Sequence, residues 1–392
     1  MRLLLFVFLL VPNFAFALEW DGKGDFSLAN EYREFPQSGF GPHSHAYESI
    51  VLAKYQLRFF PSTAVRLEAT PEVRGFVSRM VGRGPGEPGY ATVEGPERLF
   101  DFKTNLVSGN TAQWLLDTER LNFIFSLGDF EMQLGRKPIG VGTLKVLPIW
   151  NKFSRPLPNT AGPNLIFGQD SATLRWQSGQ WSLQALDIEG KSARPEEAVR
   201  WMEAILYNPA LELHLMASRW WEKNVVGLAF AKDLGGATLR GEALGIGLDR
   251  SGKENEFQGG LGLEYALNET WTFLGESLFQ SDGADRTSEY TVLIPSPYRP
   301  LRAKAYAFLQ ATAQIDAYWI ANFGTLVNGI DGSFYPLLKL TRSLSDHLDA
   351  ALDLRGPVGR NGKEFSREAF RFPRGRTIGA PSQIQFLLTA SF

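Results

Sequence analysis

The sequence has no cysteine, only four histidines, almost no net charge and no long apolar run beyond its first residues. Without cysteine there is no disulfide framework, no lipid-modified cysteine and no cysteine-ligated metal. After Leu18, no segment approaches the ~20 consecutive apolar residues that a transmembrane helix needs. A formal charge of −2 gives no reason to expect nucleic acid as a partner. Nothing in the sequence predicts a metal or another cofactor.

The first seventeen residues have the pattern of a cleaved signal peptide. Met1-Arg2 is a basic start, residues 3–11 are apolar, and residues 13–17 (NFAFA) end in a small-x-small cleavage pattern. The apolar core is too short to span a bilayer comfortably, and an uncleaved anchor is the alternative. No linker or break in composition follows. We therefore predict a signal peptide over 1–17 and a single domain over 18–392.

The last residues resemble the C-terminal strand of bacterial outer-membrane barrels, which ends in phenylalanine and is bound by the insertion machinery. Ile384, Phe386, Leu388 and Phe392 share one face, and mostly polar residues share the other. Together with a signal peptide, this strand predicts an all-β transmembrane barrel in the bacterial outer membrane. The composition agrees, because 39 glycines and 13% aromatic residues accompany hydrophobicity that is spread thinly along the chain.

Alternation of apolar and polar residues predicts an antiparallel up-and-down barrel. In residues 45–60 and 62–79, bulky apolar side chains alternate with charged ones over far more positions than a soluble sandwich would show. Counting back from Phe392, tight turns are expected at Leu344-Ser345, Asp316-Ala317, Asn268-Glu269, Leu234-Gly236, Asn208-Pro209, Ser178-Gly179, Gly128-Asp129 and Pro61-Ser62. The count gives about 18 strands, with 16 as the alternative. It requires residues 197–207, which look like an amphipathic helix, to be a strand.

A barrel of this size encloses a water-filled bore, so its inward-facing residues bear on function. Alternation places charges of both signs there, and their plain structural role is a polar wall whose charges offset one another. At a constriction such charges also tune ion selectivity. The inward basic candidates are Arg58, Arg66, Arg74, Arg175, Arg240 and Lys304.

One predicted loop has no acidic residue between Met132 and Gln169, yet it contains several basic ones. It is also rich in glycine, proline and apolar residues, which suits a hairpin folded into the bore. We expect residues 136–155 to narrow the channel, with Leu144, Val146, Leu147, Ile149 and Trp150 packed against the wall. The basic residues of this loop are Arg136, Lys137, Lys145, Lys152 and Arg155. The last outer loop is also basic, and it predicts either anion passage or contact with lipopolysaccharide.

The segment 116–142 resembles the early hairpin of porin-like barrels of the alginate-export family. That family pairs an Asp-Arg-Leu strand with a Gly-Arg-Gln turn, and the matching residues here are Asp117, Arg120-Leu121 and Gly135-Arg136-Lys137. Lys137 replaces the glutamine, and the segment Pro148-Ile149-Trp150-Asn151 lacks the aspartate of the family's Pro-x-Asp loop. The resemblance implies a substrate path lined by basic side chains, with Arg136 and Lys137 near its outer half. By strict alternation Arg136 shares the lipid-facing side with Met132 and Leu134, so either a bulge at Gly135 turns it or it lies above the hydrocarbon.

The sequence offers little for catalysis. Two histidines fall in the first outer loop, His214 in a strand and His347 beside a turn, and there is no Gly-x-Ser-x-Gly or His-Glu-x-x-His motif. We therefore predict a non-enzymatic channel for passive passage of small hydrophilic, anionic solutes. The alternatives are a receptor or adhesin that acts through its outer loops and, less favoured, an outer-membrane hydrolase.

Overall fold

The computed structural model describes residues 19–34, 45–78, 100, 102–109, 112–147, 149–151, 168–188, 199–220, 223–247, 255–290, 301–366, 370–371, 377–378, 380 and 382–392. The predicted signal peptide and two predicted site residues, Lys152 and Arg155, lie outside these ranges, so those predictions stay open. Within them, no helix is long and apolar enough to span a bilayer.

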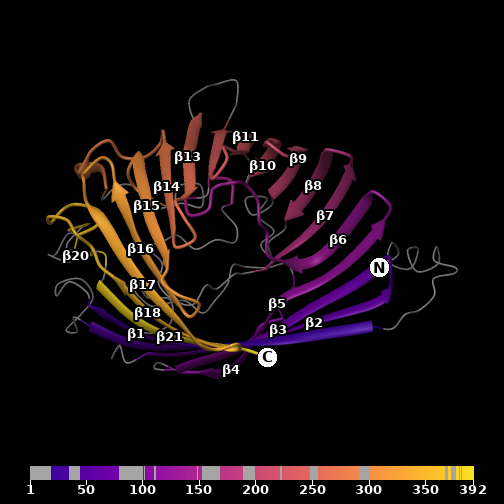
Figure 1. Cartoon of the computed structure of the whole chain (residues 1–392), viewed down its shortest axis with the longest axis horizontal. Coiled ribbons are helices and arrows are strands. Elements are labelled where there is room, and N and C mark those ends of the chain that lie inside the picture. Colours follow the sequence, from indigo (N-terminus) through magenta and orange to yellow (C-terminus); the bar gives the residue numbers. More distant parts are fainter. Residues whose placement is uncertain are drawn as a thin grey trace.

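The described chain is almost entirely antiparallel β-strand (Figure 1). The first half comprises β1 (Glu19–Glu34), β2 (His45–Ser62), β3 (Val65–Ser78), β4 (Thr104–Ser108), β5 (Ala112–Leu127), β6 (Phe130–Lys137), β7 (Gln169–Ser178), β8 (Trp181–Ile188), β9 (Val199–Asn208) and β10 (Leu211–Trp220). The second half comprises β11 (Lys223–Asp233), β12 (Ala237–Ile246), β13 (Glu256–Ala266), β14 (Trp271–Gln280), the short 3₁₀ helix η2 (Thr287–Glu289), β15 (Ala305–Gln314), β16 (Trp319–Asn328), β17 (Phe334–Ser345), β18 (Leu348–Arg355), β19 (Phe370–Arg371), β20 (Thr377–Ile378) and β21 (Ser382–Ser391).

The sheet closes on itself, because β1 pairs with β2 on one side and with β21 on the other. The closed sheet contains 19 strands, one of which, β4, is a short addition that bonds only to β5. The barrel wall therefore has 18 strands, as the parity count predicts. At the seam, Gly24 and Phe392 exchange both backbone hydrogen bonds, at 2.7 and 2.9 Å.

Tight turns join the strands at the end of the barrel where Glu19 and Phe392 lie. The structure has turns of two to four residues at or next to all eight expected places. The first is shifted from Pro61-Ser62 to Thr63-Ala64 and the last from Leu344-Ser345 to Asp346-His347, and the β2–β3 and β17–β18 ladders each contain a register shift beside the turn. In the turn after β5, Gly128 has a φ of +56°, which glycine adopts without steric cost. The contested segment 197–207 is largely β9, paired with β8 and β10. Up-and-down topology therefore overrides the local helical pattern.

Alternation sorts side chains to the two faces of the wall. Bulky apolar residues such as Leu174, Met202 and Leu261 are exposed on the outside, whereas inward positions carry buried polar residues such as Glu68, Glu242 and Gln385. This apolar-out, polar-in arrangement is the reverse of a soluble protein and is what a lipid-embedded barrel with a water-filled interior requires.

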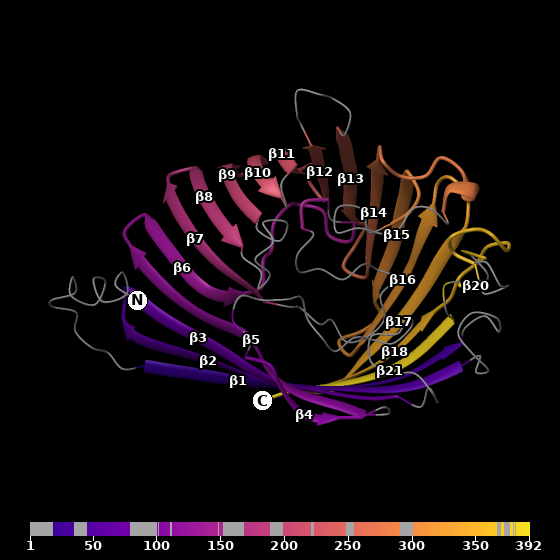
Figure 2. The same ribbon diagram turned by 180° about the vertical axis from the view of Figure 1, so that it is seen from behind.

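The chain leaves the wall after Lys137, and residues 138–147 and 149–151 run inside the barrel, on the side of β10–β13 (Figures 1 and 2). We call the described residues 138–147 and 149–151 the inner loop. Because β6 ends early, part of the edge of β5 is left without β6 as a partner. The short strand β4 bonds to that edge at Gln113–Leu116, while β6 bonds to β5 further along, at Leu121–Leu127.

Candidate functional site: the bore and its inner loop

The inner loop is packed against the wall by apolar side chains, as expected from its composition. Leu144, Leu147, Ile149 and Trp150 are 0–1% exposed and belong to the main buried cluster, with Val146 at its edge. The wall residues of this cluster come from β8–β17 and include Trp201, Met216, Leu244 and Leu278. The indole of Trp150 packs edge-on against Trp201, with ring centroids 5.6 Å apart. The loop is therefore part of a second hydrophobic core inside the barrel.

Two inward-facing glutamates bind the backbone of this loop. The carboxylate of Glu242 on β12 accepts N–H bonds from Thr143, Leu144, Ile149 and Trp150, the last three at 2.8–2.9 Å. Glu242 is 4% exposed, so its charge is held by backbone amides in place of water.

Glu276 on β14 does the same for the middle of the loop. Its two oxygens accept the N–H groups of Lys145, Val146 and Leu147 at 2.6–2.8 Å. We call Glu242 and Glu276 the carboxylate clasp. A buried N–H that loses its acceptor costs about 1–3 kcal/mol. The seven N–H groups that the clasp binds therefore make the loop a fixed part of the bore.

Glycines on the inner face of the wall make room for the loop. A Cβ on Gly227 of β11 would lie 2.7 Å from Trp150, and one on Gly262 of β13 would lie 3.0 Å from Leu144. On Gly260 it would lie 2.9 Å from Ile149. These positions face inward by alternation, and the absence of their side chains lets the loop approach the backbone.

The loop lysine within the described residues is already ion-paired. Lys145 Nζ lies 2.6 and 2.7 Å from the two oxygens of Glu264 on β13, and Arg240 NH1 lies 2.9 Å from the same carboxylate. Lys145 and Arg240, two of the predicted site residues, thus share one counter-charge at the edge of the loop. The lysine side chain is 46% exposed, so solvent weakens this pair.

Arg136 is enclosed and does not line open water. Its side chain is 1% exposed, and its Nε lies 2.8 Å from Asp170, with Asp117 at 3.5 Å and the ring of Phe102 at 5.0 Å. The preceding Gly135 has a φ of +126°, and a Cβ there would clash with the carbonyl oxygen of Leu121. The β5–β6 ladder passes Gly135 without a register shift. The strand pairing therefore stays regular through Gly135, and the bulge considered from the sequence is not present there.

Basic side chains gather on the inner face of β2–β7. Arg58 and Arg66 lie 3.8 and 3.2 Å from Glu68, and Arg120 NH1 lies 3.0 Å from the same carboxylate. Arg58 also lies 3.7 Å from Asp21. Three guanidinium groups therefore share Glu68, with Asp21 as a further, exposed counter-charge.

Lys137 and Arg175 continue this surface with neutral hydrogen-bond acceptors. Lys137 Nζ donates to Gln133 at 2.5 Å and to Thr173 at 2.6 Å. Arg175 donates to the side-chain oxygen of Gln184, the shorter bond being 2.9 Å. Arg175 is opposite Glu131 in the β6–β7 ladder, but that carboxylate accepts from Gln133. We call the following residues the basic wall: Arg58, Arg66, Arg120, Lys137 and Arg175.

The two remaining predicted residues are ion-paired elsewhere. Arg74 is 1% exposed and bonded to Glu72, with Asp117 at 3.6 Å. Lys304 lies at the outer end of β15, 2.7 Å from Asp285. The structure therefore divides the predicted basic residues into the basic wall and several paired groups.

Sequence reasoning missed Arg120 and the clasp. Arg120 follows Glu119 at a register shift in the β3–β5 ladder, which breaks the alternation that would have placed it. Alternation does place Glu242 on the inner face. Nothing in its own strand, however, shows that it binds a loop about a hundred residues earlier in the chain. The run Gly259-Gly260-Leu261-Gly262 was the available signal, because it removes side chains from two successive inward positions.

The described part of the last outer loop is folded onto the end of the barrel. The half-buried Glu364 accepts bonds from Asn328 Nδ2 at 2.8 Å and Arg302 N at 3.2 Å, and from the Tyr306 hydroxyl. Its own N–H donates to Asp331 at 2.8 Å. Burial raises the pKa of the Glu364 carboxyl above its ordinary value. This loop is anchored by polar contacts and does not extend freely into solvent.

Groups suited to catalysis do not assemble in the described ranges. His214 is buried between two carboxylates, with Glu203 at 2.6 Å and Glu212 at 2.7 Å. No group of three or more potential metal ligands occurs among the residues that the structure describes.

Fold and site together define the class: an 18-stranded porin-like β-barrel fold with a loop packed against the inner face of its wall. No family model and no curated protein matches the sequence. Among solved structures, Acinetobacter baumannii OccAB1 matches at a TM-score of 0.57 and 9% identity, covering 95% of this chain and 96% of its own. Pseudomonas aeruginosa OpdK with vanillate matches at 0.55 and 11%, covering 95% and 98%. A BenF-like porin from Pseudomonas fluorescens Pf-5 matches at 0.56 and 12%, covering 96% and 100%.

Proposed function

We propose that this protein is a passive outer-membrane channel for small hydrophilic anions. The observation that carries the proposal is the pair Lys137 and Arg175, two cations on the inner face whose bonded acceptors are neutral amide and hydroxyl oxygens. The other three members of the basic wall share Glu68 and Asp21. This side of the bore therefore attracts anions.

The inner loop has a different role in this proposal. It narrows the bore from the opposite direction and sets the size limit, while the basic wall sets the preference for charge. Lys145 contributes less to the charge preference because Glu264 offsets it. Arg136 contributes least, since it is buried between Asp117 and Asp170. The parts of Lys152 and Arg155 stay as predicted from the sequence.

Two similarities support an anionic solute. OpdK, which shares the fold, has been crystallised with vanillate, the anion of an aromatic acid. The resemblance of residues 116–142 to alginate-export barrels points to an anionic polysaccharide. A monomeric carboxylate suits a bore with a fixed inner loop better than a polymer does, so we favour it as the solute.

We also propose two contacts outside the bore. The C-terminal strand, which ends at Phe392, would be bound by the barrel-insertion machinery before the seam closes. The basic residues of the last outer loop would contact the phosphates of lipopolysaccharide. Neither contact involves the channel itself.

Planar-bilayer recording of the purified protein tests the function. We expect ion-sized conductance with a reversal potential that indicates anion preference. The double variant Lys137→Gln, Arg175→Gln should move that potential toward zero without changing the size of the bore. Arg342→Gln is the matched control, because Arg342 stacks on Trp319 away from the basic wall, at 5.2 Å. Cation preference of the unmodified protein would overturn the proposal, and absence of conductance would favour an outer-loop receptor.

A further inference from the structure

Two arginines face each other on the outside of the barrel. Arg200 on β9 and Arg219 on β10 are direct partners in the antiparallel ladder. Both are exposed, and alternation places them on the same outward face as Met202 and Leu215. Like charges placed directly opposite each other on a sheet are destabilising, so this pair needs an anion beside it.

The neighbouring side chains offset only part of the positive charge of this arginine pair. Along the same row of the sheet, Asp187 lies opposite Arg200, and its carboxylate is 3.8 Å from the guanidinium. On the other side, the partner of Arg219 is the neutral Asn224. In this row one carboxylate therefore serves two guanidinium groups, and a net positive charge remains on the membrane-facing surface.

The arginine pair lies near the outer ends of its strands, at the level where a lipid headgroup would be. β9 begins at Val199 and β10 ends at Trp220, so both arginines are one residue from the outer ends of their strands. A charge on the lipid-facing surface costs about 2–4 kcal/mol at the bilayer midplane but about 0–1 near the interface. The outer ends of the strands are where the headgroups of the outer leaflet would lie.

An apolar hollow in the outer surface extends from the arginines toward the tight-turn end. Two adjoining hollows of ≈ 610 and ≈ 550 Å³ share Leu174, Ala185, Met202 and Ala217. Arg200 and Arg219 line the first, and Phe130 and Trp176 line the second. Small side chains at Ala185 and Ala217 leave room between bulkier neighbours. We call the two hollows and the arginine pair the lipid groove.

We propose that the lipid groove binds one phosphorylated lipid of the outer leaflet, lipopolysaccharide, with a phosphate on Arg200 and Arg219 and an acyl chain in the hollow. This inference rests on the proposed outer-membrane function, which places the strand ends in that leaflet. Planar guanidinium groups bind phosphate oxygens in bidentate fashion, and the apolar hollow accepts a hydrocarbon chain. The bound phosphate would offset the repulsion within the pair.

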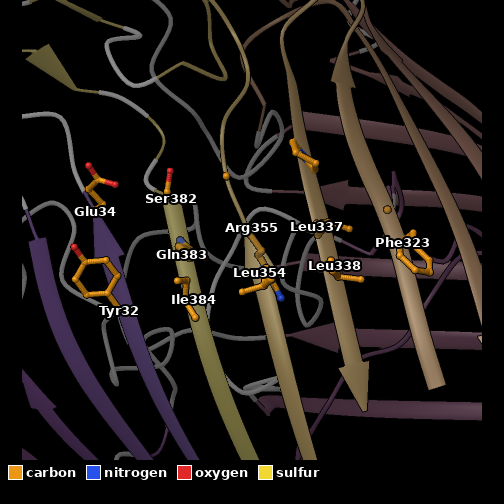
Figure 3. A pocket seen from close by; sticks show the side chains of 13 residues that line it. Tyr32, Glu34, Phe323, Leu337, Leu338, Leu354, Arg355, Ser382, Gln383 and Ile384 are labelled. Carbon is orange, nitrogen blue, oxygen red and sulfur yellow. The ribbon is translucent and has the colours of Figure 1, made fainter. Parts of the chain in front are cut away.

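A separate hollow on the outer surface has a similar apolar volume but lacks the arginine pair of the lipid groove. It measures ≈ 570 Å³ and crosses β1, β16–β18 and β21, with Phe323, Leu338 and Ile384 among its apolar lining (Figure 3). Glu34 and Ser382 lie toward its upper end in Figure 3. Arg355 also lines this hollow, but its guanidinium lies 2.5 Å from Asp353. This hollow has the apolar volume without the arginine pair, so it should hold a chain but no phosphate.

The test is native mass spectrometry of the purified protein titrated with deep-rough lipopolysaccharide, intact or dephosphorylated. We expect the unmodified protein to retain one intact lipid and Arg200→Gln, Arg219→Gln to bind it at least tenfold more weakly, because charge-assisted bonds are lost. Arg342→Gln, another arginine away from the groove, should bind as the unmodified protein does. Dephosphorylated lipid should bind all three proteins equally weakly.

Three results would overturn the inference. Equal binding of intact lipid by the double variant would remove the arginine pair from the site. Equal binding of intact and dephosphorylated lipid by the unmodified protein would leave only an apolar hollow. A dimer that disappears in the double variant would show that a second copy of the chain covers this face. Conductance of the same preparations separates the two proposals: it should be unchanged in the double variant, and its absence in the unmodified protein would contradict only the channel function.

Discussion

The two sides of the bore use the same residue type in opposite ways. On β12 and β14, Glu242 and Glu276 accept backbone N–H groups of the inner loop, and both side chains are buried. On β3, Glu68 lies among three guanidinium groups. A buried carboxylate must be satisfied in either case. Backbone donors fix a segment in place, whereas cationic side chains leave a charged lining. The groups that a buried glutamate binds therefore determine whether it holds a loop in place or forms part of a charged lining.

Removal of the clasp should have the largest effect. Glu242→Gln with Glu276→Gln keeps the volume but leaves only one acceptor oxygen per side chain, so several buried N–H groups lose partners at about 1–3 kcal/mol each. We expect the loop to detach and single-channel conductance to rise and fluctuate between levels. Glu264→Gln is the control, because Glu264 binds side chains at the loop's edge. Unchanged conductance in the double variant would mean that the apolar contacts alone hold the loop.

Adding a side chain to the wall where the inner loop packs against it should lower the conductance. In Gly227→Ala the new Cβ would lie 2.7 Å from Trp150 and 2.8 Å from Met216. Overpacking of this kind costs about 1–3 kcal/mol. With the clasp intact, the loop should shift toward the bore and lower the conductance. Gly275→Ala is the matched control, since its Cβ would lie 3.5 Å from Leu309, an ordinary contact. A rise in conductance would show that the clasp cannot retain a displaced loop.

The contrast between paired and unpaired cations predicts a smaller effect on selectivity. Arg175→Gln removes a charge bonded to a neutral acceptor, whereas Lys145→Gln removes one that Glu264 offsets. We expect Arg175→Gln to move the reversal potential toward zero by clearly more than Lys145→Gln does. Recording both variants in the same salt gradient measures this difference. Equal shifts would assign the charge preference to the inner loop as much as to the basic wall.

The smallest effect concerns the outer loop and pH. Burial raises the pKa of Glu364 in the folded protein, so the folded loop binds its proton more tightly than the unfolded segment does. Its contribution to stability is therefore fully present below the ordinary glutamate pKa and is lost as pH rises through the raised value. Hydrogen exchange at Glu364 and Phe365, corrected for intrinsic rates, should show more protection at acidic pH. Glu364→Gln should abolish this dependence, and protection that increases with pH would contradict it.

The architecture was predictable because a barrel repeats one local rule many times. Alternation, eight tight turns and the terminal Phe392 determine the strand number, and parity corrects the helical appearance of residues 197–207. The loop's position was also predictable, since an acid-free segment with Leu144 and Trp150 suits a bore better than open solvent. The fold of the similar solved structures agrees with the predicted barrel.

The charge pairing was not predictable, because it depends on distances between strands and on local irregularities. Arg240 and Glu264 lie on neighbouring strands, and only the register brings them together. Arg120 follows a break in the alternation at the β3–β5 shift, and Arg136 is paired with carboxylates of two neighbouring strands, Asp117 and Asp170. A pattern along one strand contains no information on these contacts. The sequence therefore predicts which residue types line the bore better than which of them remain unpaired.

The short strand β4 shows what it costs a barrel to send part of its own chain inward. Once the chain turns in after Lys137, backbone groups at Gln113–Leu116 would form an open edge, the kind of surface that pairs with other chains and promotes aggregation. β4 comes from an outer connection, where length and sequence are usually free to vary. Here that freedom is limited, because this connection has to supply the strand that pairs with the edge of β5 where β6 is absent.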